Sequence, residues 1–166
     1  MSVPLIRFCQ VGEEPLLREV FYSAVHGIAS ARYSPLQCAT WAPETYDIAA
    51  WTQRIQQNKP FVAELDGALV GFADLQASGY IDQFFVAAHA AGQGIGGALM
   101  RRIFQAAESQ RLTLLTSHVS LNAQPFFQRY GFEIEREQTV EIAGVSFSNA
   151  RMVKMLASML KHQPEA

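Results

Sequence analysis

The sequence predicts a single mixed α/β domain, and three observations support this prediction. The chain has 166 residues, the usual size of one domain with a hydrophobic core. Hydrophobic residues make up 49% of it and charged residues 17%, which is typical of a folded globular protein. The spacing of apolar residues changes repeatedly between a helical and an extended period. Because no repeat, linker or low-complexity segment divides the chain, we expect the domain to occupy residues 1–158, followed by a polar tail, residues 159–166.

The N-terminal part is expected to hold one strand and two helices. Residues 5–8 form a short apolar run that indicates a strand. Apolar residues four positions apart over residues 15–31 predict one long helix, which ends before a turn at Pro35. A second turn at residues 41–44 leads into a second predicted helix, residues 45–57.

The middle of the chain is expected to be extended. Residues 61–65 and 68–75 flank Asp66-Gly67, and an Asp-Gly pair supplies the positive φ angles of a tight hairpin turn. Residues 80–86 form a third extended run. The sequence therefore predicts a β-hairpin followed by one further strand.

The C-terminal part is expected to alternate helices and strands before two closing strands. The predicted elements are a helix over residues 95–110, a buried strand over 112–119, a short helix over 122–130 and strands over 132–142 and 145–156. Pro125 lies near the start of the short helix, where its missing amide is tolerated, and Gly131 is a natural helix stop. The complete order, β-α-α-β-β-β-α-β-α-β-β, describes a mixed α/β domain.

Composition excludes several functional classes. The formal charge of −2 provides no basic field for nucleic acid, and no apolar run approaches the roughly 18 residues that a membrane helix needs. Cys9 and Cys38 are too few for a disulfide framework or a zinc site, and the four histidines have no metal-ligand spacing. We therefore expect a cytoplasmic protein without metal, nucleic-acid or membrane partners.

A glycine cluster lies between the third extended run and the helix that follows it, with Gly92, Gly94, Gly96 and Gly97 inside six residues. Glycine removes the Cβ that would hold an anion away from the backbone, and helix N-terminal amides favour negative charge. A diphosphate group is therefore the expected ligand of this loop. A plain strand-to-helix turn is the alternative.

Two nucleotide-binding motifs also contain glycine-rich loops and can be compared with residues 92–97. Gly92, Gly94 and Gly97 satisfy G-x-G-x-x-G, but the acidic residue that a dinucleotide site requires about twenty positions later is absent. A Walker loop requires Lys-Ser or Lys-Thr after its last glycine, where this chain has Ala98-Leu99. Neither motif explains the loop.

Two segments resemble signatures of the GNAT acetyltransferase superfamily. Residues 120–132, SLNAQPFFQRYGF, resemble its second signature, and residues 91–96, AGQGIG, resemble its first, in the family's order. Residues 32–43 and 138–152 also resemble an uncharacterised bacterial subgroup. The resemblance implies a GNAT fold, with a central, mostly antiparallel sheet and splayed parallel strands flanked by helices. It also implies acetyl-CoA as co-substrate, without a metal.

The resemblance implies a cofactor that lies between the strands at residues 80–86 and 112–119. The expected cofactor-binding residues are Phe84, Phe85, Val86, Ala91, Gly92, Gln93, Gly94, Ile95, Gly96, Gly97, Asn122, Pro125 and Phe126. The first three are expected to act through their backbone, and Asn122 either binds the pantetheine arm or caps the short helix. Ala91 stands where the family commonly has Arg or Gln, so backbone amides must hold the diphosphate.

The resemblance also indicates catalytic residues. Asp82 lies near the position where some family members have a base that acts through water, and we expect it to be desolvated; a purely structural carboxylate is an equal alternative. Asp74 is the reserve candidate. Phe127 stands where many members have the tyrosine that protonates the leaving thiolate. Tyr130 is the candidate replacement, with structural packing as the alternative.

The expected reaction is direct acetyl transfer to an amine, because no cysteine accompanies a histidine in a catalytic spacing. The acceptor is expected to be a small molecule, an amino acid or a peptide, contacted by Tyr33, Trp41, Asp74 and His118. A GNAT-fold sensor that binds acyl-CoA without catalysis is the alternative function. The closing hairpin is expected to be able to pair two copies as a homodimer.

Overall fold

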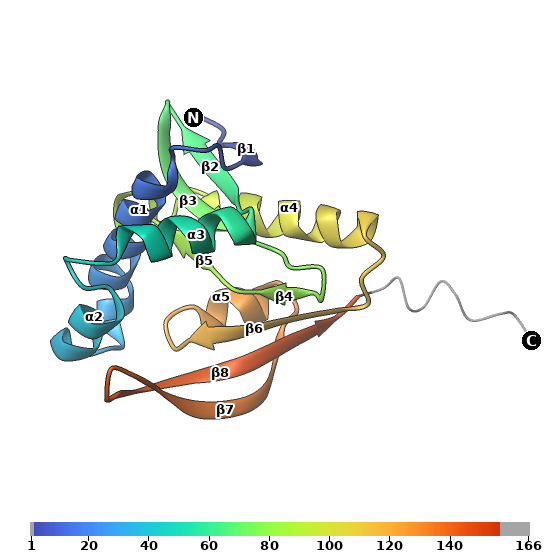
Figure 1. Cartoon of the computed structure of the whole chain (residues 1–166). Helices are drawn as coiled ribbons and strands as arrows, with labels where there is room; N and C mark the ends of the chain where they lie inside the picture. Colours follow the sequence, from blue (N-terminus) through green and yellow to red (C-terminus); the bar gives the residue numbers. More distant parts are fainter. Residues whose placement is uncertain (1, 157–166) are drawn as a thin grey trace, which may run out of the picture.

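In the computed structural model, which describes residues 2–156, the strands form two sheets (Figure 1). The first sheet has the order β1 (Leu5–Phe8), β2 (Phe61–Leu65), β3 (Ala68–Ala73), β5 (Phe84–Val86), and all its pairs are antiparallel. The second has the order β4 (Tyr80–Ile81), β6 (Leu114–Ser120), β8 (Val145–Met155), β7 (Glu133–Ile142). Among the described strands, β4 and β6 form the one parallel pair.

The two sheets separate within the third predicted extended run. Tyr80 and Ile81 pair with β6, whereas Phe84 to Val86 pair with β3, so one run of sequence contributes to both sheets. In the described part of the chain, no strand pairs with the edge of β5 that faces away from β3. We call this separation of β5 from β6 the split. The prediction of a single strand over residues 80–86 was wrong, because the chain changes sheet at residues 82–83.

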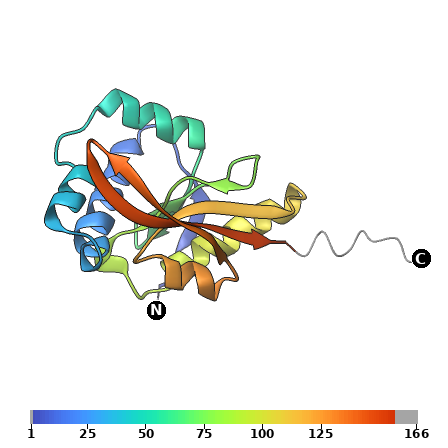
Figure 2. The ribbon, with the colours of Figure 1, turned by 90° about the horizontal axis from the view of Figure 1, so that it is seen from below.

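Helices pack around the two sheets of the described residues. They are α1 (Glu14–Gly27), α2 (Pro35–Trp41), α3 (Ile48–Asn58), α4 (Ile95–Ser109) and α5 (Gln124–Arg129). Successive side chains of a strand point to opposite faces, so Val62 joins the core under α1 and α3, whereas Phe61 and Ala63 join the core under α4. Figure 2 shows α4 and α5 on the other side of the strands from α3.

The N-terminal helices differ from the prediction. The first helix stops at Gly27, a weak helix former, and a short 3-10 turn follows it, where the sequence predicted a helix to residue 31. The sequence indicated a turn at Pro35 and another at residues 41–44, so the helix α2 between them was not predicted. Ser34 and Gln37 form a capping box at its start, with Pro35 in the first turn, and this S-P-L-Q pattern is the signal that could have found it.

The predicted hairpin turns are confirmed. Asp66 and Gly67 have φ angles of 51° and 83° between β2 and β3, and Ala143 and Gly144 have 47° and 78° between β7 and β8. Most other elements match the prediction within two or three residues. The predicted tail, residues 159–166, lies outside the described residues. None of the helices described is long and apolar enough to cross a membrane.

Candidate active site

A pocket of about 400 Å³ lies at the split. Its lining comes from both strands that diverge there, with Phe84 and Phe85 from β5 and residues 117–120 from β6. Side chains from α1, α2, α3, α5, β7 and β8 complete it. Elements that are distant in sequence therefore surround the gap between the two sheets.

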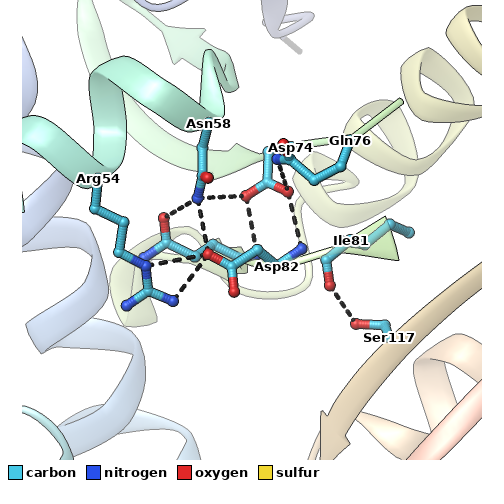
Figure 3. Close-up of polar contacts among 8 residues, drawn as sticks. Arg54, Asn58, Asp74, Gln76, Ile81, Asp82 and Ser117 are labelled. Carbon is cyan, nitrogen blue, oxygen red and sulfur yellow. Dashed lines mark hydrogen bonds and ion pairs between the residues drawn. The ribbon is translucent and has the colours of Figure 1, made fainter. Parts of the chain in front are cut away.

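Asp74 fixes the geometry of the split. Its carboxylate is 0% exposed and accepts hydrogen bonds from the backbone N–H groups of Asp82 (2.8 Å) and Gln83 (2.9 Å) (Figure 3). Gln76 Nε2 (3.1 Å) and Asn58 Nδ2 (3.4 Å) donate to the same carboxylate. Because residues 82–83 carry the chain from one sheet to the other, Asp74 holds the point at which the sheets part.

Burial raises the pKa of Asp74 from its ordinary value of 3.8 to about 6. The hydrogen bond from the Asp82 amide opposes this change because it stabilises the ionised form, as does the bond from Gln76. The negative charge of Asp82 raises the pKa further. The carboxylate that the fold desolvates is therefore Asp74.

The expectation that Asp82 would be desolvated was wrong. Its side chain is 23% exposed, lines the pocket and is paired with Arg54, whose Nη2 and Nε lie 2.9 and 3.1 Å from Oδ2. Asn58 Nδ2 donates to the same oxygen at 2.8 Å (Figure 3). Arg54 and Asn58 share one face of α3, because they are four residues apart. Asp82 is thus an oriented, ionic group at the pocket surface.

The phenols predicted near the reaction occupy different places. Tyr130 packs against Phe104 and Phe126, and a Cβ added at Gly97 would lie 2.5 Å from its hydroxyl. It therefore covers the first turn of α4 and is not part of the pocket lining. Phe127, 3% exposed, lines the pocket in the place where the family signature has tyrosine.

Two other tyrosines line the pocket. Tyr33 donates to the carbonyl oxygen of Ser148 (2.6 Å) and accepts from the amide of Leu121 (3.0 Å), so its hydroxyl is engaged, and burial raises its pKa. Burial also raises the pKa of Tyr80, as do the charges of Asp82 and Asp74. Within residues 2–156, Tyr80 is therefore the pocket tyrosine whose hydroxyl makes no hydrogen bond, and its raised pKa keeps it protonated.

The residues predicted to face the acceptor are partly brought together. Trp41 lies in an aromatic group with Tyr33, Phe85 and Phe147, and all four line the pocket. His118 also lines it, with Nδ1 2.7 Å from Gln138 Nε2. Asp74 is the exception, since it is buried beneath residues 82–83 and does not line the pocket.

The glycine loop ends in an open helix N-terminus. Gly92 and Gly94 have φ angles of 75° and 81°, and a Cβ at either position would meet nothing within 4 Å. Gly94 is the N-cap of α4, and no side chain caps the helix there. The first amides of α4 are therefore free for an anion, and space for it exists outside the loop.

Besides the phosphate contact predicted for them, Gly96 and Gly97 have a packing role. Both lie inside α4, and a Cβ at Gly96 would come within 3.1 Å of the Phe126 ring. They allow α5 to pack closely on the start of α4. Phe126 in turn contacts Phe84, with ring centroids 5.4 Å apart, so the loop and the pocket are separated by one layer of side chains.

The direction of the backbone N–H and C=O groups of β5 reduces the number of residues that could contact the cofactor. Gln83 O and Ala87 N bond to residues of the β3 side, so by alternation the backbone groups of Phe84 and Val86 point to the unpaired edge. The backbone of Phe85 faces β3, so a cofactor at the split cannot pair with it. The cofactor contacts of Phe84 and Val86 stay predictions.

Asn122 does not cap α5. That helix begins at Gln124, its N-cap Ala123 makes no side-chain bond, and Asn122 Oδ1 is buried without a hydrogen-bond partner. The same holds for Oδ1 of Asn149, which lines the pocket. A buried unsatisfied carbonyl oxygen is costly unless a ligand satisfies it, so both amides are suited to contact one.

The pocket residues for which the sequence suggested no role include Arg18, Arg54 and Asn149. Arg54 could have been found from its spacing to Trp51 and Asn58 on one helix face. Arg18 and Asn149 carry no local signal, because tertiary packing alone brings α1 and β8 to the pocket. Residues 2–156 contain no group of three or more His, Cys, Asp or Glu side chains arranged to hold a metal ion.

Comparisons with known proteins agree with this geometry. Residues 29–154 match the family model described as acetyltransferase (GNAT) domain. A protein of Escherichia coli (strain K12), named as the uncharacterized N-acetyltransferase YafP, is 35% identical over 147 residues, which cover 89% of this chain and 93% of YafP.

Solved structures show the same fold. A GCN5-related N-acetyltransferase from Rhodopseudomonas palustris superposes with a TM-score of 0.89 at 28% identity, covering 94% of this chain and 98% of the other. The PaiA N-acetyltransferase from Thermoplasma acidophilum, solved in complex with coenzyme A, superposes with a TM-score of 0.70 at 17% identity, covering 93% and 99%.

Proposed function

The chain belongs to the GNAT family of acetyltransferases and is an N-acetyltransferase, and from this premise we propose that it transfers an acetyl group from acetyl-CoA directly to a primary amine of a small molecule, amino acid or peptide. The main support for the proposal is the position of the Phe84 ring. Its ring lines the pocket and also packs on Phe126, which lies against the first turn of α4. The proposed anion site and the proposed acceptor pocket therefore lie on opposite sides of the contact between Phe84 and Phe126.

The residues present fit acetyl-CoA. We propose that the amides of residues 92–97 bind its diphosphate, with no contribution from the side chain of Ala91. The absence of a side-chain cap on α4 and the open space outside Gly92 and Gly94 support this assignment. The backbone groups of Phe84 and Val86 on the unpaired edge of β5 are suited to the amides of the pantetheine arm. Asn122 Oδ1 supplies a further acceptor.

Acetyl-CoA supplies the activated acetyl group as a thioester, and the chain must provide a neutral amine nucleophile. We propose that Asp82, through water, accepts the proton of the acceptor's ammonium group. Arg54 and Asn58 hold one of its oxygens, and its place in the pocket lining exposes it to the acceptor. Direct transfer is favoured because neither cysteine lines this pocket, and burial raises the pKa of the Cys38 thiol.

We propose Tyr80 as the proton donor to the leaving thiolate, in place of Tyr130. Tyr80 lines the pocket, and its raised pKa keeps it protonated. Tyr130 covers the first turn of α4 instead. Phe127 cannot donate a proton, and this substitution is the observation that favours the alternative function, a sensor that binds acyl-CoA without turnover.

The test mixes purified protein with acetyl-CoA and a panel of primary amines and measures release of free thiol. Thiol release that depends on the amine and yields the N-acetyl product supports the proposal. Calorimetric binding of CoA without acetylation of any amine would favour the sensor. Absence of CoA binding would contradict both.

A further inference from the structure

Arg18 is a buried cation in the wall of the pocket. It lies on α1, is 9% exposed and lines the pocket at the end formed by α1 and α3. Its guanidinium carbon lies 4.2 Å from the ring centroid of Tyr46, 5.0 Å from that of Phe21 and 5.3 Å from that of Trp51. These three rings hold the guanidinium in a fixed orientation through packing and cation–π attraction.

This cation has no counter-charge. Nη2 donates to the carbonyl oxygen of Pro43 at 2.8 Å, and no carboxylate of the described residues forms an ion pair with Arg18. Burial lowers its pKa, and a smaller effect of the neighbouring Tyr46 opposes this. Arginine nevertheless stays protonated in proteins. A buried charge without a partner is costly in free energy, so an anion bound next to Arg18 would reduce this cost.

Other arginines show the contrast. Arg7 pairs with Glu13 and Glu64, and Arg151 pairs with Glu135. In the pocket itself, Arg54 is neutralised by Asp82. The charged pair and Arg18 together leave the pocket with one excess positive charge among the Lys, Arg, Asp and Glu side chains that line it.

Two donors of Arg18 remain free. Nε and Nη1 make no hydrogen bond, and neither is among the fully buried side-chain nitrogens of the described residues that lack a partner. They therefore keep some accessible surface, and Arg18 is part of the pocket lining. The rest of this end of the pocket is aromatic, with Phe21, Trp41 and Phe85 in mutual contact.

We propose that Arg18 binds a carboxylate of the acetyl acceptor, so that the acceptor is an amine with both a carboxylate group and an apolar body. This inference rests on the proposed function, which supplies the amine. The carboxylate neutralises Arg18, the apolar body packs on Phe21 and Trp41, and the amine is left for the Asp82 end of the pocket. Amines without an anionic group lack the interaction that compensates the buried charge.

The test compares substrates in pairs, in which a carboxylate is replaced by a neutral amide. The pairs are phenylalanine with phenylalaninamide, and 4-(aminomethyl)benzoate with 4-(aminomethyl)benzamide. We expect kcat/KM for the better acid to exceed that for its amide by roughly 10- to 100-fold, the range of a charge-assisted hydrogen bond at a buried site. Equal kcat/KM within both pairs would overturn the proposal.

Variants then locate the effect. Arg18→Met should reduce the acid-to-amide ratio to about one, and Arg18→Lys, which keeps the charge, should retain part of it. Arg102→Met is the matched control, since Arg102 also packs on an aromatic ring, Phe61 at 4.6 Å, outside this pocket, and its ratio should equal that of the wild type. An unchanged ratio in Arg18→Met would assign carboxylate recognition to another group.

A binding readout separates this inference from the proposed function. In the presence of CoA, the acid of each pair should raise the Tm of the wild-type protein more than its amide does, and Arg18→Met should lose this difference. This result without acetylation of any amine would support carboxylate binding and contradict the enzymatic proposal. Acetylation with no acid-dependent change in Tm and equal rates within each pair would do the reverse.

Discussion

The two sides of the split differ in construction: the glycine loop, β5 and α5 form the proposed cofactor side, and α1, α2, α3 and β8 form the proposed acceptor side. The first offers backbone groups, namely the uncapped amides of α4 and the unpaired edge of β5. The second offers side chains such as Arg18, Trp41 and Asn149 from separate elements. Backbone recognition requires glycines and leaves a compact pattern in the sequence, whereas a surface assembled from side chains leaves none. The difference teaches why the cofactor of such a fold is easier to predict than its acceptor.

The largest effect is expected on CoA binding, from a substitution on the proposed cofactor side. Gly94→Glu places a side chain and a negative charge where the loop is open, and should weaken CoA binding roughly 100-fold or more by calorimetry, since it opposes both the space and the charge of an anion site. Gly67→Glu is the matched control, because Gly67 also has a left-handed φ, 83°, with nothing within 4 Å of its Cβ position, and lies in the β2–β3 turn. Equal losses in both variants would assign the effect to backbone strain.

The second prediction separates the two carboxylates at the split. Asp74→Ala leaves the buried amides of residues 82–83 without an acceptor and should lower the free energy of unfolding by about 3 kcal/mol. Asp82→Ala removes a part-exposed ion pair and should cost at most about 1 kcal/mol, while kcat/KM falls roughly 100-fold. Urea unfolding and steady-state kinetics measure the two quantities. Wild-type turnover by Asp82→Ala would return Asp82 to a structural role.

The third prediction follows from the raised pKa of Asp74, about 6 against an ordinary 3.8. Between these pH values the folded protein holds a proton that the unfolded chain releases, so the contribution of Asp74 to stability is fully present below about pH 4 and is lost as the pH rises through about 6. Two pKa units correspond to roughly 3 kcal/mol at most. Urea unfolding at several pH values should show this fall in the wild type and a smaller one in Asp74→Asn. Parallel curves for the two proteins would contradict the assignment.

The smallest expected effect distinguishes between the two candidate proton donors, Tyr80 and Tyr130. Tyr80→Phe removes the phenol that lines the pocket and should lower kcat roughly tenfold, with KM for acetyl-CoA little changed. Tyr130→Phe is the matched control and should keep kcat, since its hydroxyl lies over the first turn of α4. The opposite order of the two variants would restore Tyr130 to the role that the sequence suggested.

Local patterns predicted much of the fold. The Asp66-Gly67 turn, the α4 stripe and the closing strands follow from periods and turn chemistry within a few residues. The change of sheet at residues 82–83 could not be predicted, because it depends on the buried carboxylate of Asp74 reaching two amides eight and nine residues away. Periodicity describes one strand at a time and carries no information about which sheet receives it.

The candidate site divides in the same way. The loop at residues 92–97 was found from its glycines, although the structure assigns Gly96 and Gly97 to close packing with α5. The desolvated carboxylate was assigned to Asp82 when it is Asp74, because spacing does not reveal which side chain lies beneath the sheet. Arg18 was missed since a cation on an amphipathic helix is ordinarily solvated, and tertiary packing alone buries this one.

The hydroxyl of Tyr33 links the strand β8 at Ser148 to the chain at Leu121, just ahead of α5. An enzyme that evolves toward a new acceptor cannot easily exchange this residue, because the same atom braces the segment that leads into α5. A change of substrate range is therefore expected through substitutions at other pocket residues, such as Val140 and Ile142, whose side chains do not brace another segment. Directed evolution of this scaffold should accumulate changes there and leave Tyr33 intact.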